Sequence, residues 1–536
     1  MEFNAQRYRY SSRRAVVYGV KGMVATGQPL AAQAGLEILK KGGNAVDAAV
    51  ATAACLTVVE PTSNGIGGDA FALVWNEGKL HGLNASGFSP KMTDASVLLS
   101  AGLKEVPKFG WHSVTVPGAP SAWAELSKKF GRLPLREVMA PAISYAGDGY
   151  PVSPTTAKLW AQAAERYAHE CKGAEFQSWT ETFCPEGRAP FPGEKWSSRA
   201  HAETLSLIAE SGAEDFYRGR LAEKIDAFAR AHGGWLRASD LAEFHPEWVE
   251  PISVNYRGYD VWEIPPNGHG IVALMALNIL KNYELPECRE NSEAYHAFIE
   301  AMKLAFADGA RYVADRRFMT VGTEHLLSDE YAASRRGLIG QMALKPEAGS
   351  PHKSGTVYLA TADGEGCMVS MIQSNYMGFG SGLAVPGTGI ALHNRGNNFS
   401  LDPESSNFMA PGKKPYHTII PGFLTKDGAA VGPFGVMGGF MQPQGHLQVV
   451  TNMIDFGMNP QEALDAPRWQ WIKERMVQME QAVPNHIILD LAARGHDIKV
   501  LGDSIYFGRG EMIVMTGHGT LAGATEPRTD GCVAAW

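Results

Sequence analysis

The chain has 536 residues, of which 45% are hydrophobic and 19% are charged, as in an ordinary globular protein. A formal net charge of -8 and a pI near 6.1 argue against nucleic acid as the main partner, because no basic patch dominates. The longest apolar stretch, 48–59, is too short to cross a bilayer, and the polar N-terminus leads into no apolar signal segment. We therefore expect a cytoplasmic protein with no membrane partner.

Near the start of the chain we expect two helices. Residues 31–41 have helical periodicity that stops at two glycines, 42–43, which is a common C-terminal signal. Asn44 then caps an alanine-rich helix over 47–59, and its apolar character predicts burial on both sides. A glycine-rich loop, 64–69, separates this helix from the next strand.

The middle of the chain is predicted to be largely helical. Amphipathic segments lie at 205–208, 221–231 and 294–313. Residues 165–196 are richer in proline, glycine and charge, which predicts a surface excursion. Residues 340–355 are polar and contain two prolines, so we expect a flexible connector there.

After this connector the sequence becomes rich in predicted strands. Residues 356–362 and 367–373 form two β-prone runs joined by a short turn. Further strands are expected near 418–424 and 505–515, and a helix over 444–454. Helices that flank stacked antiparallel strands predict a layered α+β fold.

Cysteines and histidines give no sign of a metal site. The six cysteines lack zinc-like spacing, and the 16 histidines show no helical pairing suited to a metal, although His393 and His417 remain candidates to line a pocket. A cytosolic chain keeps its thiols reduced, so no disulfide is expected. We expect neither a metal nor another cofactor.

Thr356 is the first candidate for catalysis. It follows Gly355 directly and begins a β-prone run after a polar segment. If the chain is cut before Thr356, the new α-amino group, with a pKa of about 7.7–8.0, becomes a base on the same residue as the hydroxyl nucleophile. Taken alone, the same residues also fit the ordinary first position of a strand.

Two glycine blocks offer further chemistry. The block at 378–382 resembles half of a dinucleotide fingerprint but lacks the strand–helix unit and the later acidic residue. The block at 435–439 leaves backbone N–H groups uncovered, which suits an oxyanion hole for acyl transfer. It equally suits a strand-to-helix turn that needs positive φ.

Several segments together resemble, in order, the γ-glutamyltransferases, which are N-terminal-nucleophile hydrolases: 22–26, 43–49, 65–69, 116–118, 300–308, 433–439 and 526–531. The resemblance runs from about Gly22 to the C-terminus. It implies a four-layer αββα sandwich and autocleavage into a large chain, 1–355, and a small chain, 356–536. The two chains are expected to stay together as a heterodimer and one αββα unit, and further pairing is left open.

The resemblance also implies roles for individual residues. Thr356 is the expected nucleophile, and Gly355 the residue whose carbonyl is attacked during maturation. Ser374 matches a family threonine whose hydroxyl supports the new terminal amine. Gly438 and Gly439 match the glycine pair whose N–H groups face the oxyanion.

The part of the family pattern that binds the glutamyl group is altered here. Ser86 stands in the place of an arginine that holds the α-carboxylate of glutamate. Asn398 replaces the aspartate that pairs with the α-amino group. A neutral amide cannot repeat the charge-assisted bond of that aspartate, which is about twice as strong as a neutral one.

Three further positions differ from the family pattern around the same group. His417 and Thr418 replace a serine pair that grips the carboxylate, and Tyr376 replaces a supporting asparagine, with Asn375 beside it. Arg395 stands where the family has an uncharged glutamine. An arginine there is suited to bind a carboxylate with two hydrogen bonds.

The sequence therefore predicts an autoprocessing amidohydrolase or acyltransferase. Its substrate is expected to be a small-molecule γ-glutamyl amide or a related carboxylate-bearing acyl amide, with water or an amine as acceptor. One alternative is a small-acid amidase or acylase, acting on oxamate or a glutaryl amide without true γ-glutamyl activity. Others are an uncleaved, inactive relative that acts as a binding protein, and a cofactor enzyme that uses 378–382.

Overall fold

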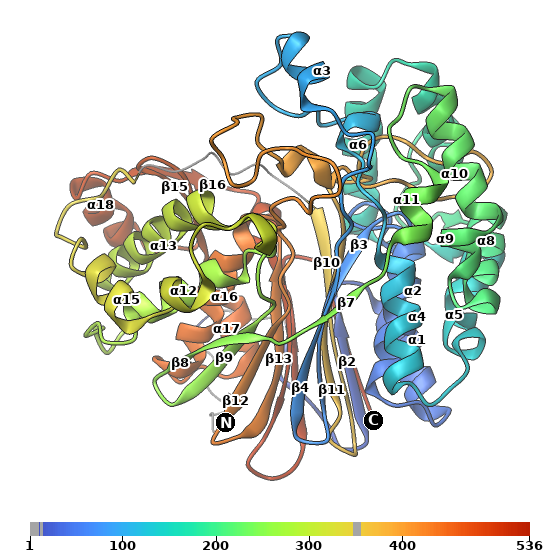
Figure 1. The fold of residues 1–536 in the computed structure, drawn as a ribbon. Helices are drawn as coiled ribbons and strands as arrows, with labels where there is room; N and C mark the ends of the chain where they lie inside the picture. Colours follow the sequence, from blue (N-terminus) through green and yellow to red (C-terminus); the bar gives the residue numbers. More distant parts are fainter. Residues whose placement is uncertain (1–9, 11–13, 347–354) are drawn as a thin grey trace.

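Two large sheets stack face to face, and helices cover both outer surfaces (Figure 1). The computed structural model describes residue 10, residues 14–346 and residues 355–536. The arrangement is a four-layer αββα sandwich, so the predicted fold class is confirmed. No helix among these described residues is long and apolar enough to cross a membrane.

The first sheet has seven antiparallel strands and carries the predicted nucleophile on a central strand. In spatial order they are β19 (Cys532–Ala535), β2 (Gly22–Thr26), β10 (Gly355–Asp363), β11 (Met368–Tyr376), β3 (Asp69–Asn76), β4 (Lys79–Ala85) and β7 (Glu247–Val249). All residues of β11 are buried, because helices cover one face of this sheet and the second sheet covers the other. The predicted hairpin of β10 and β11 is confirmed.

The second sheet also has seven antiparallel strands. In spatial order they are β1 (Val17–Gly19), β18 (Leu521–Thr525), β17 (Arg509–Met515), β13 (Ala429–Met437), β12 (Gly422–Lys426), β9 (Tyr259–Glu263) and β8 (Ile252–Tyr256). An apolar cluster that includes Phe71, Tyr358 and Phe423 packs between the two sheets. Because the ring of Tyr358 lies against Gly435, a Cβ atom there would come within 2.3 Å of it.

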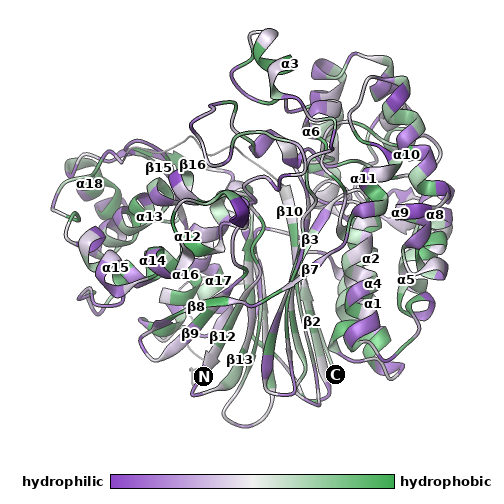
Figure 2. Ribbon diagram, viewed as in Figure 1, coloured by the Kyte–Doolittle hydropathy of each residue, from purple (hydrophilic) through white to green (hydrophobic). Residues whose placement is uncertain are grey.

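Helices of the first half of the chain lie on the outer side of the first sheet, except for the third, which stands apart from the sheet (Figure 1). They are α1 (Pro29–Lys40), α2 (Ala45–Val59), α3 (Ala95–Ser100), α4 (Ala119–Phe130), α5 (Leu135–Asp148), α6 (Pro154–Glu170), α7 (Gln177–Phe183), α8 (Arg199–Ser211), α9 (Glu214–Arg218), α10 (Arg220–Ala231) and α11 (Ala238–Glu243). Every residue of α2 is buried, as its composition predicts, and Asn44 forms a capping box with Asp47. Apolar residues concentrate along the strands and on the helices beside them (Figure 2).

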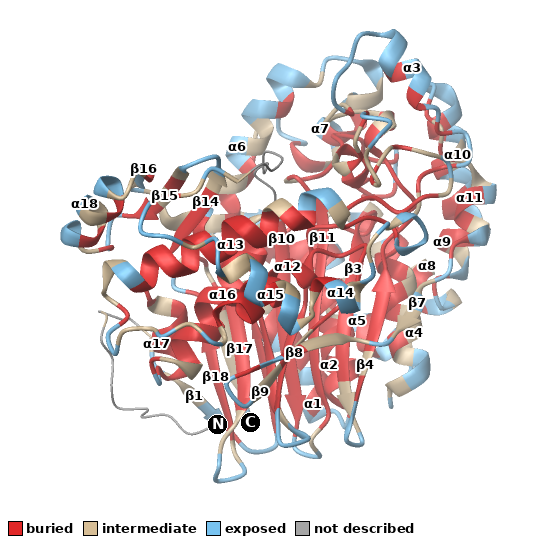
Figure 3. Ribbon diagram, turned by 60° about the vertical axis from the view of Figure 1, so that its left-hand side comes forward, coloured by how far each residue is buried: buried red, intermediate tan, exposed pale blue. Residues whose placement is uncertain are grey.

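The second sheet is covered by a separate set of helices. They are α12 (Gly270–Leu280), α13 (Ser292–Tyr312), α14 (Thr323–Leu326), α15 (Asp329–Arg336), α16 (Met441–Ile454), α17 (Pro460–Asp465) and α18 (Asn485–Ala493). Burial is deepest in the strands and in α12 and α16, whereas exposed residues gather on the outer helices and loops (Figure 3).

Small elements complete the fold. There are five 3-10 helices in the described chain, η1 (Trp111–Ser113), η2 (Ala174–Phe176), η3 (Arg316–Phe318), η4 (Arg395–Asn398) and η5 (Ser504–Phe507). The strands outside the two large sheets are β5 (Tyr150–Pro151), β6 (Lys195–Trp196), β14 (Trp469–Lys473), β15 (Met476–Glu480) and β16 (Asp497–Leu501).

The structure corrects three local predictions. Residues 165–196 are not simply a surface excursion, because they contain α7 and buried aromatic residues such as Trp179 and Phe183. Residues 504–507 form η5, so the predicted strand at 505–515 begins only at Arg509. The strand predicted at 418–424 begins at Gly422. Of the predicted connector, residues 347–354 lie outside the described residues.

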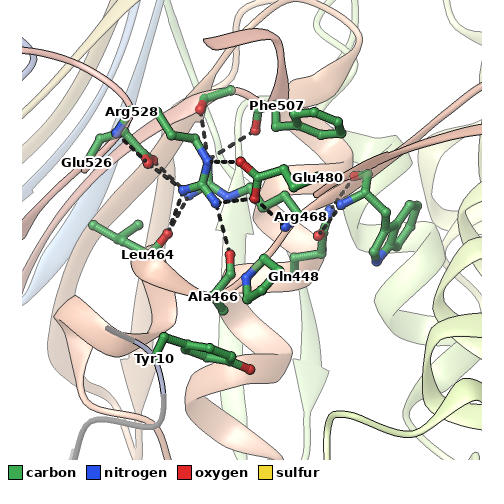
Figure 4. Close-up of polar contacts among 12 residues, drawn as sticks. Tyr10, Gln448, Leu464, Ala466, Arg468, Glu480, Phe507, Glu526 and Arg528 are labelled. Atoms are coloured by element: carbon green, nitrogen blue, oxygen red, sulfur yellow. Dashed lines mark hydrogen bonds and ion pairs between the residues drawn. The ribbon is translucent and has the colours of Figure 1, made fainter. Parts of the chain in front are cut away.

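A buried ionic network ties the end of the chain to the second sheet (Figure 4). Arg528 donates to Glu480 at 2.7 Å and to Glu526 at 2.6 Å, and Arg468 lies 2.8 Å from the other oxygen of Glu526. Glu526 also accepts a hydrogen bond from the backbone N–H of Gly510 at 2.7 Å. The network therefore fixes the beginning of β17, which lies beside the candidate site.

Candidate active site

Thr356 lies buried near the beginning of β10, where the pairing with β11 is irregular. The register shifts there, so that Ser374 and Asn375 of β11 together stand opposite Thr356. A β-bulge of this kind bends the strand and re-aims its side chains. Thr356 Oγ1 lies 3.1 Å from Ser374 Oγ and 3.5 Å from Nε2 of Gln442 in α16. The structure thus brings the predicted nucleophile and its predicted supporting hydroxyl into contact.

Ser374 is fixed by the backbone that follows it. Its Oγ accepts a hydrogen bond from the N–H of Tyr376 at 2.7 Å. Tyr376 has a φ of 74°, a left-handed conformation that is uncommon for residues other than glycine. Strained backbone of this type gathers at functional sites, which agrees with a catalytic use of this strand end.

The second glycine block forms the turn between β13 and α16. Gly438 has a φ of 136° and Gly439 a φ of 60°, so this turn requires glycine. Their carbonyl oxygens accept hydrogen bonds from the N–H groups of Met441 at 3.1 Å and Gln442 at 3.0 Å. The side chain of Gln442, three residues after Gly439, reaches Thr356, so the turn lies near the nucleophile. Both interpretations of this block, as a turn and as an oxyanion hole, are compatible with this geometry.

A buried carboxylate, Asp69, organises the end of the neighbouring strand β3, where it pairs with Ser374 across the sheet. Arg395 places Nε 3.2 Å and Nη2 3.4 Å from the two oxygens of Asp69. His417 Nε2 lies 2.6 Å from Asp69 Oδ2. Arg395 Nη1 donates to Thr418 Oγ1 at 2.7 Å. Arg395, His417 and Thr418, three of the predicted substrate residues, therefore form one cluster around an aspartate.

The charge state of this cluster follows from its contacts. Burial would raise the pKa of Asp69, but Arg395 and His417 outweigh burial and hold that pKa well below its ordinary value. Burial and then Arg395 lower the pKa of His417 to about 4. His417 Nδ1 accepts a hydrogen bond from the N–H of Ile419 at 3.3 Å, so Nε2 carries the proton donated to Asp69. At neutral pH an ionised Asp69 therefore pairs with Arg395 beside a neutral histidine.

Replacing Asp69 by asparagine should lower the free energy of unfolding by about 3–5 kcal/mol at pH 7, because buried Arg395 loses its carboxylate partner. The folded-state pKa of Asp69 lies below the value of about 3.9 in an unfolded chain, so the stabilisation is fully present above that value and is lost as the pH falls further. Urea unfolding at pH 7 and pH 3.5 measures both effects. The pairing of ionised Asp69 with Arg395 is contradicted if wild type and Asp69→Asn have the same free energy of unfolding at pH 7. It is also contradicted if their difference in this free energy is larger at pH 3.5 than at pH 7.

The remaining predicted substrate residues lie around the same cluster. The Arg395 guanidinium stands over the Tyr376 ring, 4.7 Å from its centre. Several buried polar atoms there have no hydrogen-bond partner in the described part of the chain: both side-chain polar atoms of Asn375, the Tyr376 hydroxyl and Asn398 Nδ2. Buried polar groups of this kind are ordinarily paired, so these atoms are candidates to bind water or a polar ligand.

Ser86 does not contact the Asp69 cluster directly and is connected to it through Asn267. Its Oγ donates to Asn84 Oδ1 at 2.7 Å and lies 3.3 Å from Asn267 Oδ1. The main-chain carbonyl oxygen of Asn267 in turn accepts a hydrogen bond from the backbone N–H of His417 at 3.0 Å. Ser86 thus supports the backbone behind His417.

Two cavities lie near the nucleophile. The first has a volume of about 330 Å³ and the second about 140 Å³, and they share Ile505, Tyr506 and Arg509. Gly438 lines the second. Gly378 lines the first. Residues 378–382 form a turn and bends with no strand–helix unit, so this block does not have the form of a dinucleotide site.

Three residues of the site had no role in the sequence-based prediction. Asp69 ends the glycine-rich loop 64–69. Its charge at the start of an apolar strand was the one sequence signal that could have marked it as a site residue. Gln442 and Arg509 reach the site from α16 and β17, and no local pattern marked either of them.

One buried group in the described chain has metal-ligand chemistry: His296, Glu300 and His496. The sequence prediction missed it, because His496 is distant in the chain. His296 Nδ1 lies 2.9 Å from His496 Nε2, and Lys303 Nζ donates to Glu300 Oε1 at 2.7 Å. The ammonium already neutralises the carboxylate, so we interpret this group as a structural hydrogen-bonded cluster.

Comparison with solved structures finds a close match over the whole chain. The structure of a cephalosporin acylase from Bacillus halodurans superposes with a TM-score of 0.96 and 60% sequence identity, covering 100% of this chain and 99% of that one.

Curated relatives match over nearly the same length. The glutathione hydrolase-like YwrD proenzyme of Bacillus subtilis is 38% identical, over 96% of this chain and 98% of that protein. The oxamate amidohydrolase proenzyme of Klebsiella pneumoniae is 34% identical, over 96% of this chain and 98% of that protein. The family model for gamma-glutamyltranspeptidase matches residues 31–536. The chain therefore belongs to the γ-glutamyltranspeptidase family of N-terminal-nucleophile amidohydrolases.

Proposed function

We propose that the chain cuts itself between Gly355 and Thr356 and that Thr356 then serves as the nucleophile of an amide-cleaving enzyme. The observation that carries the proposal is the buried Thr356 hydroxyl, 3.1 Å from Ser374 Oγ and 3.5 Å from Nε2 of Gln442, which follows the turn at Gly438. The relatives named as proenzymes support the maturation step. The mature enzyme is then a heterodimer of residues 1–355 and 356–536.

Maturation begins when Thr356 Oγ attacks the carbonyl carbon of Gly355. The peptide C–N bond breaks, the nitrogen becomes the free α-amine of Thr356, and water hydrolyses the resulting ester. Gly355 then ends the large chain as a carboxylate. A glycine before the nucleophile favours this step, because it has no side chain to obstruct the hydroxyl.

Turnover uses the amine produced by maturation. The α-amine accepts the Oγ proton of Thr356 while Oγ attacks the substrate carbonyl, and the N–H groups of Gly438 and Gly439 stabilise the oxyanion. The proton passes to the departing amine as the C–N bond breaks. Water, or a second amine, then attacks the acyl-enzyme, and the acyl group leaves as an acid or a new amide. Ser374 holds the amine in position.

The substrate we propose is an acyl amide that carries a carboxylate but no α-ammonium group. Asn398 cannot form the charge-assisted bond that an ammonium requires. The carboxylate of Asp69 is already paired with Arg395. Asp69 is therefore poorly placed to bind a substrate ammonium as well. The names of two relatives, an oxamate amidohydrolase and an acylase, support this substrate class.

The purified enzyme should hydrolyse glutaryl-anilide or oxamate at least as efficiently as γ-glutamyl-anilide. The rates of aniline release from the two anilides and of ammonia release from oxamate are compared as kcat/KM. A preference of more than about tenfold for the γ-glutamyl compound would mean that the α-ammonium group contributes at least 1.4 kcal/mol to recognition, and it would overturn this choice of substrate.

We further propose that the enzyme works in the cytoplasm. All six cysteines are unpaired in the structure, which is typical of proteins in a reducing compartment.

A further inference from the structure

Arg509 is shared by the cavities around the nucleophile. It lines the cavities of about 330 Å³ and 140 Å³, and together with Thr356 it lines a third of about 10 Å³. Its position follows from the sheet, since Arg509 begins β17 and pairs with Met437, the residue before Gly438. A group bound to Arg509 therefore lies close to the nucleophile and the glycine turn.

The guanidinium of Arg509 is held in place by three contacts and keeps two N–H donors that have no partner among the residues the structure describes. Its Nη1 lies 3.0 Å from Glu60 Oε1, its Nη2 3.3 Å from Ser63 Oγ and its Nε 3.2 Å from Met437 Sδ. These contacts use three of the five N–H donors of the side chain. A fixed guanidinium with two unused donors binds a carboxylate with little further loss of side-chain entropy.

Arg395, the arginine that the sequence singled out for a carboxylate, is placed differently. It is fully buried, and both its Nε and its Nη2 meet the two oxygens of Asp69, whereas Arg509 meets its protein carboxylate, Glu60, through Nη1 alone. Nη1 of Arg395 donates a further hydrogen bond to Thr418 Oγ1. Arg395 lines neither of the two larger cavities, whereas Arg509 lines both.

We propose that Arg509 binds the free carboxylate of the substrate and thereby selects carboxylate-bearing acyl amides. This inference rests on the proposed function, because it requires an amide carbonyl at Thr356. The cavity of about 330 Å³ is the site of the carboxylate-bearing acyl chain. Arg166, which pairs with Glu170 at 3.0 Å, adds a second guanidinium to its wall, and Ser63 and Gln162 add neutral polar groups.

The smaller cavity complements this assignment. Its lining includes the apolar side chains of Phe440, Trp471 and Ile472. Three glutamines and the glycine turn at Gly438 line it as well. Apolar and aromatic walls favour an apolar group through burial of its surface. We assign this cavity to the leaving amine; Tyr506 lines both cavities and so lies where the two meet.

The test compares glutaryl-4-nitroanilide with butyryl-4-nitroanilide, two substrates that differ only in a terminal carboxylate. In Arg509→Lys the ratio of their kcat/KM values should fall by about 10- to 100-fold, mainly through KM of the glutaryl compound, because an ammonium cannot replace the two parallel hydrogen bonds. Arg289→Lys is the matched control, since Arg289 is also buried and paired with a carboxylate but lines neither cavity. Its ratio should stay within about threefold of wild type, a difference below 0.7 kcal/mol.

Two outcomes would overturn the role of Arg509: a ratio unchanged in Arg509→Lys, or an equal fall in Arg289→Lys. If Arg509→Lys does not mature, a crystal structure of the wild-type enzyme with bound glutarate tests the proposal instead. A glutarate carboxylate on the Arg509 guanidinium supports the proposal, and one on Arg395 or elsewhere contradicts it. If wild type hydrolyses neither anilide and stays uncut, the proposed function itself has failed.

Discussion

Replacing Thr356 by alanine should leave one uncut polypeptide and lower amide hydrolysis by about 10⁴-fold or more, because the nucleophile and its attached base are lost together. The fold itself should persist. Thr356 contributes one buried hydroxyl, whose contacts are Ser374 at 3.1 Å and Gln442 at 3.5 Å. Gel electrophoresis and the rate of anilide hydrolysis measure the two effects.

Thr356→Ser is the matched control, because it keeps a hydroxyl on the same carbon and loses only a methyl group. It should still be cut and should keep measurable activity, since serine carries out the same chemistry. If Thr356→Ala is processed at the wild-type site, or keeps more than about one hundredth of the wild-type rate, another residue is the nucleophile.

Replacing Gly438 by alanine should lower kcat by about 10²–10³-fold, the usual cost of losing one oxyanion donor. Gly438 has a φ of 136°, and a Cβ atom there would stand 3.2 Å from Gly508 Cα and 3.3 Å from Met441 Cβ. The backbone must move to accommodate the methyl group, and the N–H group moves with it. The readout is kcat of the fully processed variant.

Gly428→Ala provides the comparison for backbone strain alone. Gly428 lies between β12 and β13 and has a φ of 76°, and a Cβ atom there would have no other atom within 4 Å. It should therefore show a similar backbone cost, of order 1 kcal/mol, with kcat close to wild type. Equal losses of kcat in Gly438→Ala and Gly428→Ala would contradict the role of Gly438 as a donor in the oxyanion hole.

Local signals in the sequence were sufficient for much of the fold. Asn44 and the alanine-rich run after it predict α2, because capping and helical packing act over a few residues. The β10–β11 hairpin follows from two β-prone runs and a short turn. The turn at Gly438 and Gly439 was recognisable because positive φ restricts the residue type there.

The composition of the site was harder to predict, because its parts meet only in three dimensions. Asp69 and Arg395 are 326 residues apart, so no local pattern shows that Arg395 already has a carboxylate partner. Arg509 begins a strand in the second sheet and reaches the site through its pairing with Met437. Residues 165–196 misled the prediction because their prolines and charges obscured the buried Trp179.

The most direct test of the account is the intact mass of purified wild-type protein, combined with N-terminal sequencing. We expect two polypeptides, residues 1–355 and 356–536, with threonine at the start of the shorter one. An active preparation that consists of one uncut 536-residue chain, or of fragments whose junction lies elsewhere, would contradict the assignment of Thr356 as a self-generated nucleophile.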